Sequence, residues 1–215
     1  MNLFLSLTYQ FTIFYFLWEK GKMKNLNYLA LYYLANIFYG AVFNSYGPLV
    51  PFFAEATGKS EGYFTVIFLM RGLGFILGGV LKMRFLKNID LHRGLAGSCL
   101  SAGVASILFI MSFNHLWLTI ISLWIATSLC LLDICINVCI IRKGEENVTR
   151  YILLGMIFLT IGYMSGAMVV SVFGIKSCIA FGVNLILLAI VFTVIPPFNE
   201  EKKEEAEVKM HKITS

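Results

Sequence analysis

Six long apolar segments leave this chain few folds to adopt. They cover residues 26–52, 62–82, 94–113, 115–141, 151–173 and 178–197. A helix needs about 20 apolar residues to cross the hydrocarbon core of a bilayer, and each segment is near or above that length. Apolar residues occur on every face of these segments, which excludes an amphipathic surface helix. The sequence therefore predicts an all-α integral membrane protein with a six-helix transmembrane bundle.

The composition agrees with a membrane protein. Hydrophobic residues make up 59% of the chain and charged residues 13%, whereas soluble domains average about 45–50% apolar and about 25% charged residues. In water such a chain would expose large apolar patches. Six spans with short connections fill most of the 215 residues, so no room remains for a sizeable soluble domain.

The chain divides into an apolar N-terminal segment with a basic linker (1–25), the transmembrane domain (26–197) and a charged tail (198–215). We expect the tail to be disordered and cytoplasmic. The N-terminal segment lacks the basic start and the small-residue cleavage site of a signal peptide. It has three interpretations: an interfacial or re-entrant segment, an extra span, or untranslated sequence before a start at Met23.

Lysine and arginine concentrate on one side of the predicted spans. That side holds the linker before the first span, the connections around 82–93 and 142–150, and the tail, whereas the other side has only Lys59 and Lys176. Basic connections stay in the cytoplasm. We therefore expect a multi-pass protein with both ends of the six-helix unit in the cytoplasm.

Two charged residues lie inside the predicted spans. Arg71 is near the middle of 62–82, and Asp133 is about five residues past the middle of 115–141, which places it roughly 7 Å nearer the cytoplasm. A charge in the hydrocarbon costs at least about 2.5–3.5 kcal/mol, so it usually has a partner or a function. An arginine side chain can span this difference in depth, which allows an Arg71–Asp133 ion pair. The pair would either handle a solute or ion, or only fix the packing.

Three asparagines accompany these charges. Asn36 is near mid-depth on the first segment, and Asn137 is one turn below Asp133 on the same helix face. Asn44 lies in the outer half of the first segment, too far from Asp133 to contact it. Each asparagine is either part of a polar pathway or a hydrogen-bonding group between helices.

Two pairs of glycines are spaced four residues apart. Gly74 and Gly78 lie in the second segment, and Gly162 and Gly166 lie in the fifth. Such pairs let helix backbones approach closely. They indicate either ordinary tight packing or smooth faces along which helices move during gating.

The sequence offers no enzyme motif. The three histidines, His92, His115 and His211, lie outside the predicted spans, and no catalytic triad, metal cluster or phosphate loop is visible. Cys135 and Cys139 share a helical face but have no histidine nearby, so small packing residues are the better interpretation. We expect no enzyme activity, no metal and no cofactor beyond a coupling sodium ion or proton.

Several stretches together resemble a known family. Residues 46–51 (YGPLVP), 56–60 (ATGKS) and 71–78 (RGLGFILG) resemble the first two helices of a major facilitator superfamily transporter. Residues 132–137 (LDICIN) resemble a Leu-Asp-Thr-Gly-x-Asn element in the fourth helix of one branch. That branch contains the sodium-dependent glucose transporter and major facilitator superfamily domain-containing protein 4. The resemblance covers about residues 26–175.

The chain also departs from the family pattern. Met83 stands where the loop after the second helix usually has an acidic residue, Leu86 stands in place of a glycine, and Cys135 replaces the glycine that follows the aspartate. The family has twelve helices in two halves, with the substrate site between them, and this chain resembles the N-terminal half.

The resemblance implies a secondary transporter, or half-transporter, for a small polar solute such as a hexose. Asp133 would then bind a coupling sodium ion or proton, Arg71 would compensate Asp133 or hold a solute hydroxyl, and Asn137 and Asn36 would donate hydrogen bonds. The expected partners are the lipid bilayer, the solute, and a second half-transporter or a second copy as a homodimer, and no nucleic acid. The alternative is a truncated, non-transporting membrane scaffold or regulatory subunit.

Overall fold

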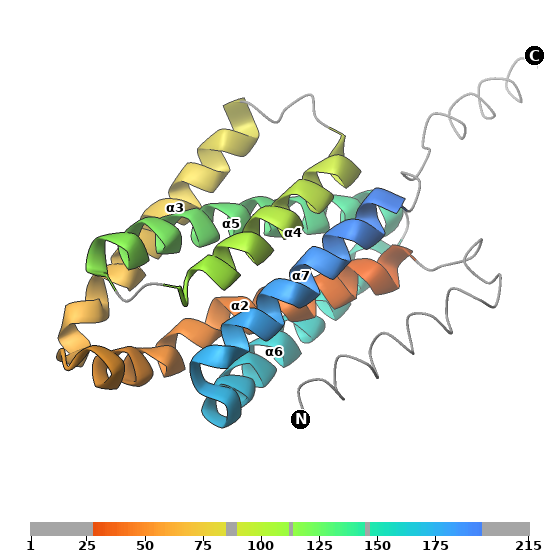
Figure 1. Cartoon of the computed structure of the whole chain (residues 1–215). Coiled ribbons are helices and arrows are strands. Elements are labelled where there is room, and N and C mark those ends of the chain that lie inside the picture. The colour runs from red at the N-terminus through yellow and green to blue at the C-terminus, as the bar shows by residue number, and fades with distance from the viewer. Residues whose placement is uncertain (1–27, 85–89, 112–113, 145–146, 195–215) are drawn as a thin grey trace, which may run out of the picture.

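The computed structural model describes residues 28–84, 90–111, 114–144 and 147–194 (Figure 1). All regular structure in these ranges is helical, as the sequence predicts. The α-helices are α2 (Tyr28–Thr57), α3 (Thr65–Arg84), α4 (Leu91–Leu108), α5 (His115–Gly144), α6 (Val148–Phe173) and α7 (Ser177–Val194). Two short 3-10 helices, η2 (Glu61–Phe64) and η4 (Gly174–Lys176), precede α3 and α7. The predicted N-terminal segment and the charged tail lie outside the described residues.

Three stretches of the described chain are long and apolar enough to cross a membrane. They are Glu61–Arg84, His115–Arg142 and Val148–Val194. The last stretch contains both α6 and α7, which are separated at Gly174, where a φ of 55° requires a glycine. The sequence predicted six spans, but α2 and α4 fall outside these stretches. Tyrosines and asparagines lower the hydropathy of α2, and His92 and Arg93 lower that of α4. The chain thus has membrane character in these stretches.

Several helix ends differ from the prediction by a few residues, and two of them have a clear physical reason. The first helix was predicted to end at residue 52, but α2 continues through Pro48 and Pro51 to Thr57. Its buried face also continues, with Leu49 and Phe53 in the core. The third helix begins earlier than predicted, at Leu91, because the Asp90 side chain caps its first turn.

The cap at the start of α4 brings His92 into the helix. The Asp90 carboxylate accepts a hydrogen bond of 3.0 Å from the backbone N–H of His92, which satisfies one of the unpaired donors at a helix start. His92 was predicted to lie outside the spans in a connection. It lies instead inside α4, where it is 6% exposed and its ring packs against Phe192 of α7 at 5.5 Å.

The helices pack in three pairs that are distant in the sequence: α2 with α6, α3 with α5, and α4 with α7. In α2 and α6, Tyr33 contacts Tyr151 and Asn44 contacts Tyr163. Because residue numbers rise together along both helices, this pair is parallel. The α3–α5 pair is parallel by the same criterion, since Gly74 lies near Leu123 and Gly78 lies near Cys130.

The α4–α7 pair is antiparallel. Gly103 lies against Gly182, whereas His92, earlier in α4, lies against Phe192, later in α7. Suppose that each of the first three helices changes places with its counterpart among the last three: α2 with α5, α3 with α6 and α4 with α7. The α2–α6 pair then becomes the α5–α3 pair, and the α4–α7 pair stays the same. This pairing has the pattern of two three-helix repeats, the arrangement known as a 3+3 inverted repeat.

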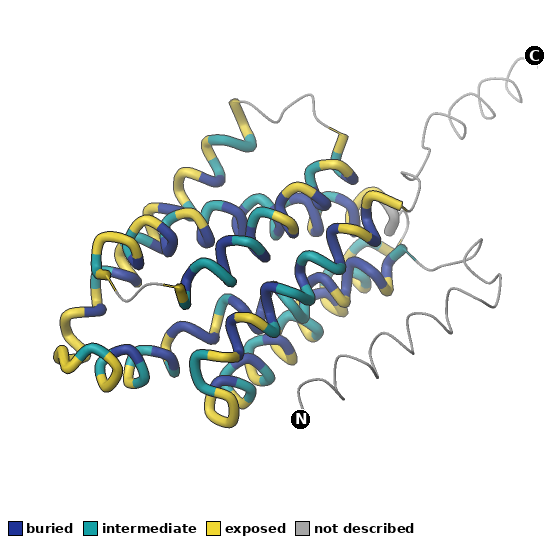
Figure 2. The backbone as a smooth tube through the Cα atoms, viewed as in Figure 1, coloured by how far each residue is buried: buried dark blue, intermediate teal, exposed yellow. Residues whose placement is uncertain are grey.

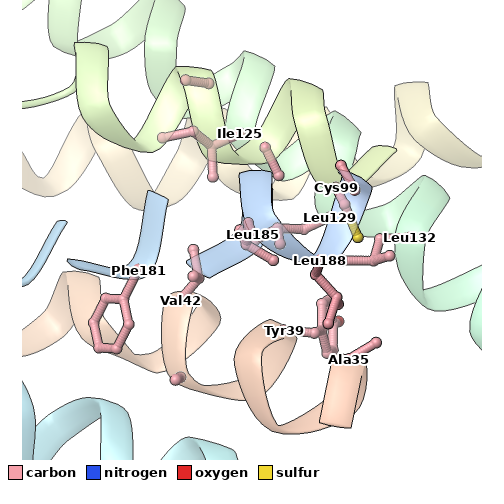
Figure 3. Close-up of a cluster of buried hydrophobic side chains, with 14 of the residues drawn as sticks. Ala35, Tyr39, Val42, Cys99, Ile125, Leu129, Leu132, Phe181, Leu185 and Leu188 are labelled. Atoms are coloured by element: carbon pink, nitrogen blue, oxygen red, sulfur yellow. The ribbon is translucent and has the colours of Figure 1, made fainter. Parts of the chain in front are cut away.

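The core lies where α2, α4, α5 and α7 meet. Val42, Cys99, Leu129 and Leu185, one from each of these helices, are at most 1% exposed. Figure 3 shows these side chains converging between the helices. The core therefore holds α4 and α7 against α2 and α5.

Both α3 and α6 have many exposed residues (Figure 2), and many of these are large and hydrophobic. Ile76 of α3 is 65% exposed and Met164 of α6 is 67% exposed. Soluble proteins rarely expose contiguous apolar surface of this kind. These faces are suited to contact with lipid or with another membrane helix.

Candidate functional site

Arg71 is buried between α3 and α2. Its side chain is 7% exposed, and its Nη2 donates a hydrogen bond of 2.7 Å to the backbone oxygen of Phe43. The guanidinium carbon lies 4.7 Å from the centroid of the Phe43 ring and 4.3 Å from that of Tyr46. Stacking on aromatic rings is worth about 2 kcal/mol for a desolvated cation. This offsets part of the cost of burying the charge, which is at least about 2.5–3.5 kcal/mol.

Asp133 is half-buried on α5. Its Oδ1 accepts a hydrogen bond of 3.0 Å from Nδ2 of Asn137, one turn further along the same helix. The side chains of Asp133 and Asn137 thus share one face of α5, as their spacing predicts. Asn137 itself is exposed, so this pair lies at the outer edge of the helix packing.

The predicted Arg71–Asp133 ion pair is not formed. In the part of the chain that the structure describes, Arg71 contacts neutral groups of α2, and Asp133 bonds to its own helix. The prediction compared only the depths of the two residues in the membrane. It took no account of the direction in which each side chain leaves its helix, and the Phe43 carbonyl and the rings hold Arg71 toward α2.

Two tyrosines connect the surroundings of the two charges. Tyr39 of α2 is 4% exposed, and Tyr163 of α6 is half-buried. Their phenol groups interact with each other, and both lie within electrostatic range of Arg71 and of Asp133. We call Arg71, Asp133, Tyr39 and Tyr163 the charged cluster. It draws one residue from each of α2, α3, α5 and α6.

Phe43 packs at the centre of this cluster. Its ring lies 5.5 Å from the ring of Tyr163, 6.0 Å from that of Tyr39 and 5.5 Å from that of Phe75. Sequence reasoning missed both tyrosines, because tyrosine is also common as an ordinary packing residue between helices. The signal was the helical spacing of Asn36, Tyr39 and Phe43, which puts them on one face of α2.

Asn36 and Asn44 each bond α2 to a backbone carbonyl of α6. Asn36 is 3% exposed, and its Nδ2 donates a long hydrogen bond of 3.4 Å to the backbone oxygen of Gly155. Its Oδ1 has no partner among the described residues. Asn44 donates to the backbone oxygen of Tyr163 at 2.9 Å. Both contacts join helices, and only Asn36 leaves a buried polar atom unpaired.

The four glycines singled out in the sequence lie where helix backbones approach each other. A Cβ on Gly74 would lie 2.6 Å from the backbone oxygen of Leu123, and one on Gly78 would lie 2.6 Å from the Cβ of Cys130. Gly162 and Gly166 lie directly against the backbone of α2 at Ile37 and Ala41. These contacts fix the two helix pairs that carry the charged cluster. The proposed part of the glycines in gating stays a prediction.

Sequence reasoning missed three further glycines of this kind. Gly40 of α2 lies against the backbone of Leu159 on α6, and Gly103 and Gly182 lie against each other in the α4–α7 pair. None of them forms a pair spaced four residues apart on its own helix. Spacing within one helix therefore found only part of the close approaches.

The described residues offer no obvious metal site. They contain no group of three histidine, cysteine or acidic side chains that could hold an ion. Cys135 and Cys139 are buried and form no disulfide. Their small side chains fill the space between α5 and its neighbours.

Comparison with known proteins gives no match: neither a family model nor a curated protein matches this chain. The assignment of a function therefore depends on the charged cluster, the helix pairing and the sequence motifs.

Proposed function

We propose that this chain is a six-helix transmembrane unit of a secondary transporter, and that its charged cluster lines the path of a small polar solute. The observation that carries the proposal is that Arg71 and Asp133 lie among long apolar helices and that neither forms an ion pair within the described ranges. Such residues are expensive in a membrane and usually mark a solute or ion pathway.

The helix pairing supports the assignment to the major facilitator superfamily. Each half of such a transporter contains two inverted three-helix repeats, and exchanging α2–α4 with α5–α7 preserves all three pairs of this chain. The motifs at 46–51, 71–78 and 132–137 point to the same superfamily. In this proposal all six α-helices cross the membrane, and the basic connections place both ends of the unit in the cytoplasm.

Asp133 is the proposed site for a coupling sodium ion or proton. It is half-buried, and Asn137 beside it adds a carbonyl oxygen that a sodium ion can use. Arg71, Tyr39 and Tyr163 would contact the solute. The resemblance to the glucose-transporter branch suggests a hexose.

A second half-transporter, or a second copy of this chain, is the proposed partner. Asn44 and Asn137 are exposed within apolar helices. Each amide donates one hydrogen bond within the chain, and lipid offers no partner to its other polar atoms. A partner face would cover these groups and close the path from the other side. The need to cover these groups favours a dimer of halves.

The test is uptake of labelled glucose into vesicles that contain the purified full-length chain, under an imposed sodium or proton gradient. We expect gradient-driven uptake that Asp133→Asn abolishes. Glu55→Gln is the matched control, because Glu55 is an exposed acidic residue at the end of α2. Uptake that is unchanged in Asp133→Asn would remove Asp133 from ion coupling, and glucose uptake equal to that of empty vesicles would contradict transport of this hexose.

One observation favours a non-transporting membrane subunit as the second candidate. Met83, which stands where the family has an acidic residue in its cytoplasmic loop, is 72% exposed at the end of α3. A transporter without that acidic residue lacks part of its cytoplasmic lock. Stable co-purification with a second membrane protein, together with no uptake in vesicles, would support this candidate.

A further inference from the structure

We propose that Arg71 recognises a carboxylate, so that the solute is a sugar acid or a carboxylate of similar size rather than a neutral hexose. This inference rests on the proposed transport function for its statement that the anion is carried across the membrane. The binding site itself stands on the surroundings of Arg71.

The charge of Arg71 has no counter-ion in the described part of the chain. Its contacts are the Phe43 carbonyl and the rings of Phe43 and Tyr46, all of them neutral. Asp133 is the acidic residue of the charged cluster, but it bonds to Asn137. The other acidic residues of the described ranges lie at helix ends and connections: Glu55, Glu61 and Asp90.

The donors of Arg71 are incompletely used. Nη2 bonds to the Phe43 oxygen, whereas Nε is buried and has no acceptor among the described residues. A buried donor without an acceptor is costly, and native structures pair nearly all such groups. A ligand oxygen at this edge of the guanidinium would supply the missing acceptor.

The shape of the site favours a carboxylate over a hydroxyl. The rings of Phe43 and Tyr46 lie against the guanidinium, so its polar edge is what a ligand can contact. A carboxylate matches this edge because it is planar and accepts two parallel hydrogen bonds from a guanidinium. A hydroxyl brings one oxygen and no charge, so it leaves the cation uncompensated.

The neighbouring side chains suit the rest of a sugar acid. The hydroxyl groups of Tyr39 and Tyr163 lie in electrostatic range of Arg71 and can bond to sugar hydroxyls. Because Nε is enclosed in this conformation, the anion enters after a movement of the rings or helices around it. The proposed transport cycle provides such a movement.

The test compares glucuronate with glucose. The two sugars differ at one carbon, which carries a carboxylate in glucuronate and a hydroxymethyl group in glucose. Binding to the purified full-length chain in detergent is measured by isothermal titration calorimetry. We expect glucuronate to bind at least tenfold more tightly than glucose. Equal affinities would overturn the proposal without any variant, and so would a failure of glucuronate to bind.

Variants then locate the site. Arg71→Gln should weaken glucuronate binding at least tenfold, and Arg71→Lys should weaken it less because it keeps the charge but not the planar edge. Arg150→Gln is the matched control, since Arg150 is an exposed arginine at the start of α6. Glucuronate affinity that is unchanged in a folded Arg71→Gln variant would overturn the assignment to Arg71.

Uptake into vesicles separates this proposal from transport itself. Tight glucuronate binding without uptake would contradict the transport function and leave the carboxylate site standing. Gradient-driven glucose uptake that does not depend on Arg71, in a protein that does not bind glucuronate, would contradict the carboxylate site and leave the transport function standing.

Discussion

Arg71 of α3 donates its hydrogen bond to the backbone oxygen of Phe43 on α2, across 2.7 Å, and does not pair with Asp133. A backbone oxygen carries a partial negative charge and cannot neutralise a cation. Among the residues that the structure describes, the charge of Arg71 is therefore uncompensated in the interior, where an apolar residue would be less costly. A buried side chain that lowers the stability of the fold is expected where that side chain serves a function.

Replacement of Arg71 by methionine tests whether the arginine is there for stability. Arg71→Met fills a similar volume and removes the buried charge, so we expect stability to be unchanged or raised by about 1 kcal/mol or more, following the behaviour of other buried charged groups. Solute binding should be lost. Thermal unfolding in detergent measures the first effect. A marked fall in the unfolding temperature would show that Arg71 supports the fold.

The glycines of α3 provide a matched pair two residues apart. A Cβ on Gly74 would lie 2.6 Å from the Leu123 backbone oxygen, whereas a Cβ on Gly72 would meet no atom within 4 Å. Gly74→Ala should destabilise the protein by about 1–3 kcal/mol, because α3 and α5 are forced apart. Gly72→Ala should stabilise it by about 0.5–1 kcal/mol, because alanine favours the helix.

Thermal unfolding of the two alanine variants, in the same detergent, measures this difference. Gly78 and Gly79 repeat the test one turn later, since Gly78 is in close contact with Cys130 and Gly79 meets no atom within 4 Å. Equal stabilities within each pair would show that α3 and α5 do not approach each other as described.

The helices, and the close approaches at four of the glycines, were predictable from the sequence, because length, apolar character and glycine spacing are local properties. The end of α2 was not. Pro48 and Pro51 normally mark a helix end, but the buried contacts of Leu49 and Phe53 continue the helix past them. Tertiary packing outweighed a local signal at this point.

The hydrogen-bond partner of Arg71 could also not be predicted from the sequence. Its depth in the membrane could be counted in residues, but the direction of its side chain depends on how α2 and α3 face each other. The two tyrosines of the charged cluster could not be predicted for a related reason. Tyr39 and Tyr163 come from helices far apart in the sequence, and only the parallel α2–α6 pair brings them together.

Two asparagines on α2 should respond in opposite ways to replacement by leucine. Asn44→Leu removes a hydrogen bond of 2.9 Å to the Tyr163 oxygen, and bonds of this kind between membrane helices average about 0.6 kcal/mol. Asn36→Leu removes a long bond of 3.4 Å together with a buried oxygen that has no partner in the described part of the chain, so the stability of this variant should be equal to or higher than that of the native protein.

Unfolding temperatures of both asparagine variants, with uptake measured in parallel, separate structure from function. If Asn36 belongs to the pathway, Asn36→Leu loses uptake while it keeps stability. If Asn36→Leu were less stable than Asn44→Leu, the Asn36 amide would form a hydrogen bond that stabilises the fold, and its oxygen would have a partner.

Access of water to Asp133 gives the last prediction. Maleimides react with cysteine in water and not in the hydrocarbon core, so they report a wet path. In the Asn137→Cys variant the new thiol replaces the exposed neighbour of Asp133, and we expect an impermeant maleimide to label it in intact vesicles. Met164→Cys is the control, because Met164 is 67% exposed on the apolar face of α6 and should stay unlabelled in lipid. The five native cysteines are buried in the folded chain, so they should add little background. Labelling at residue 164 but not at residue 137 would place the Asp133 face of α5 against acyl chains and would contradict its part in a solute pathway.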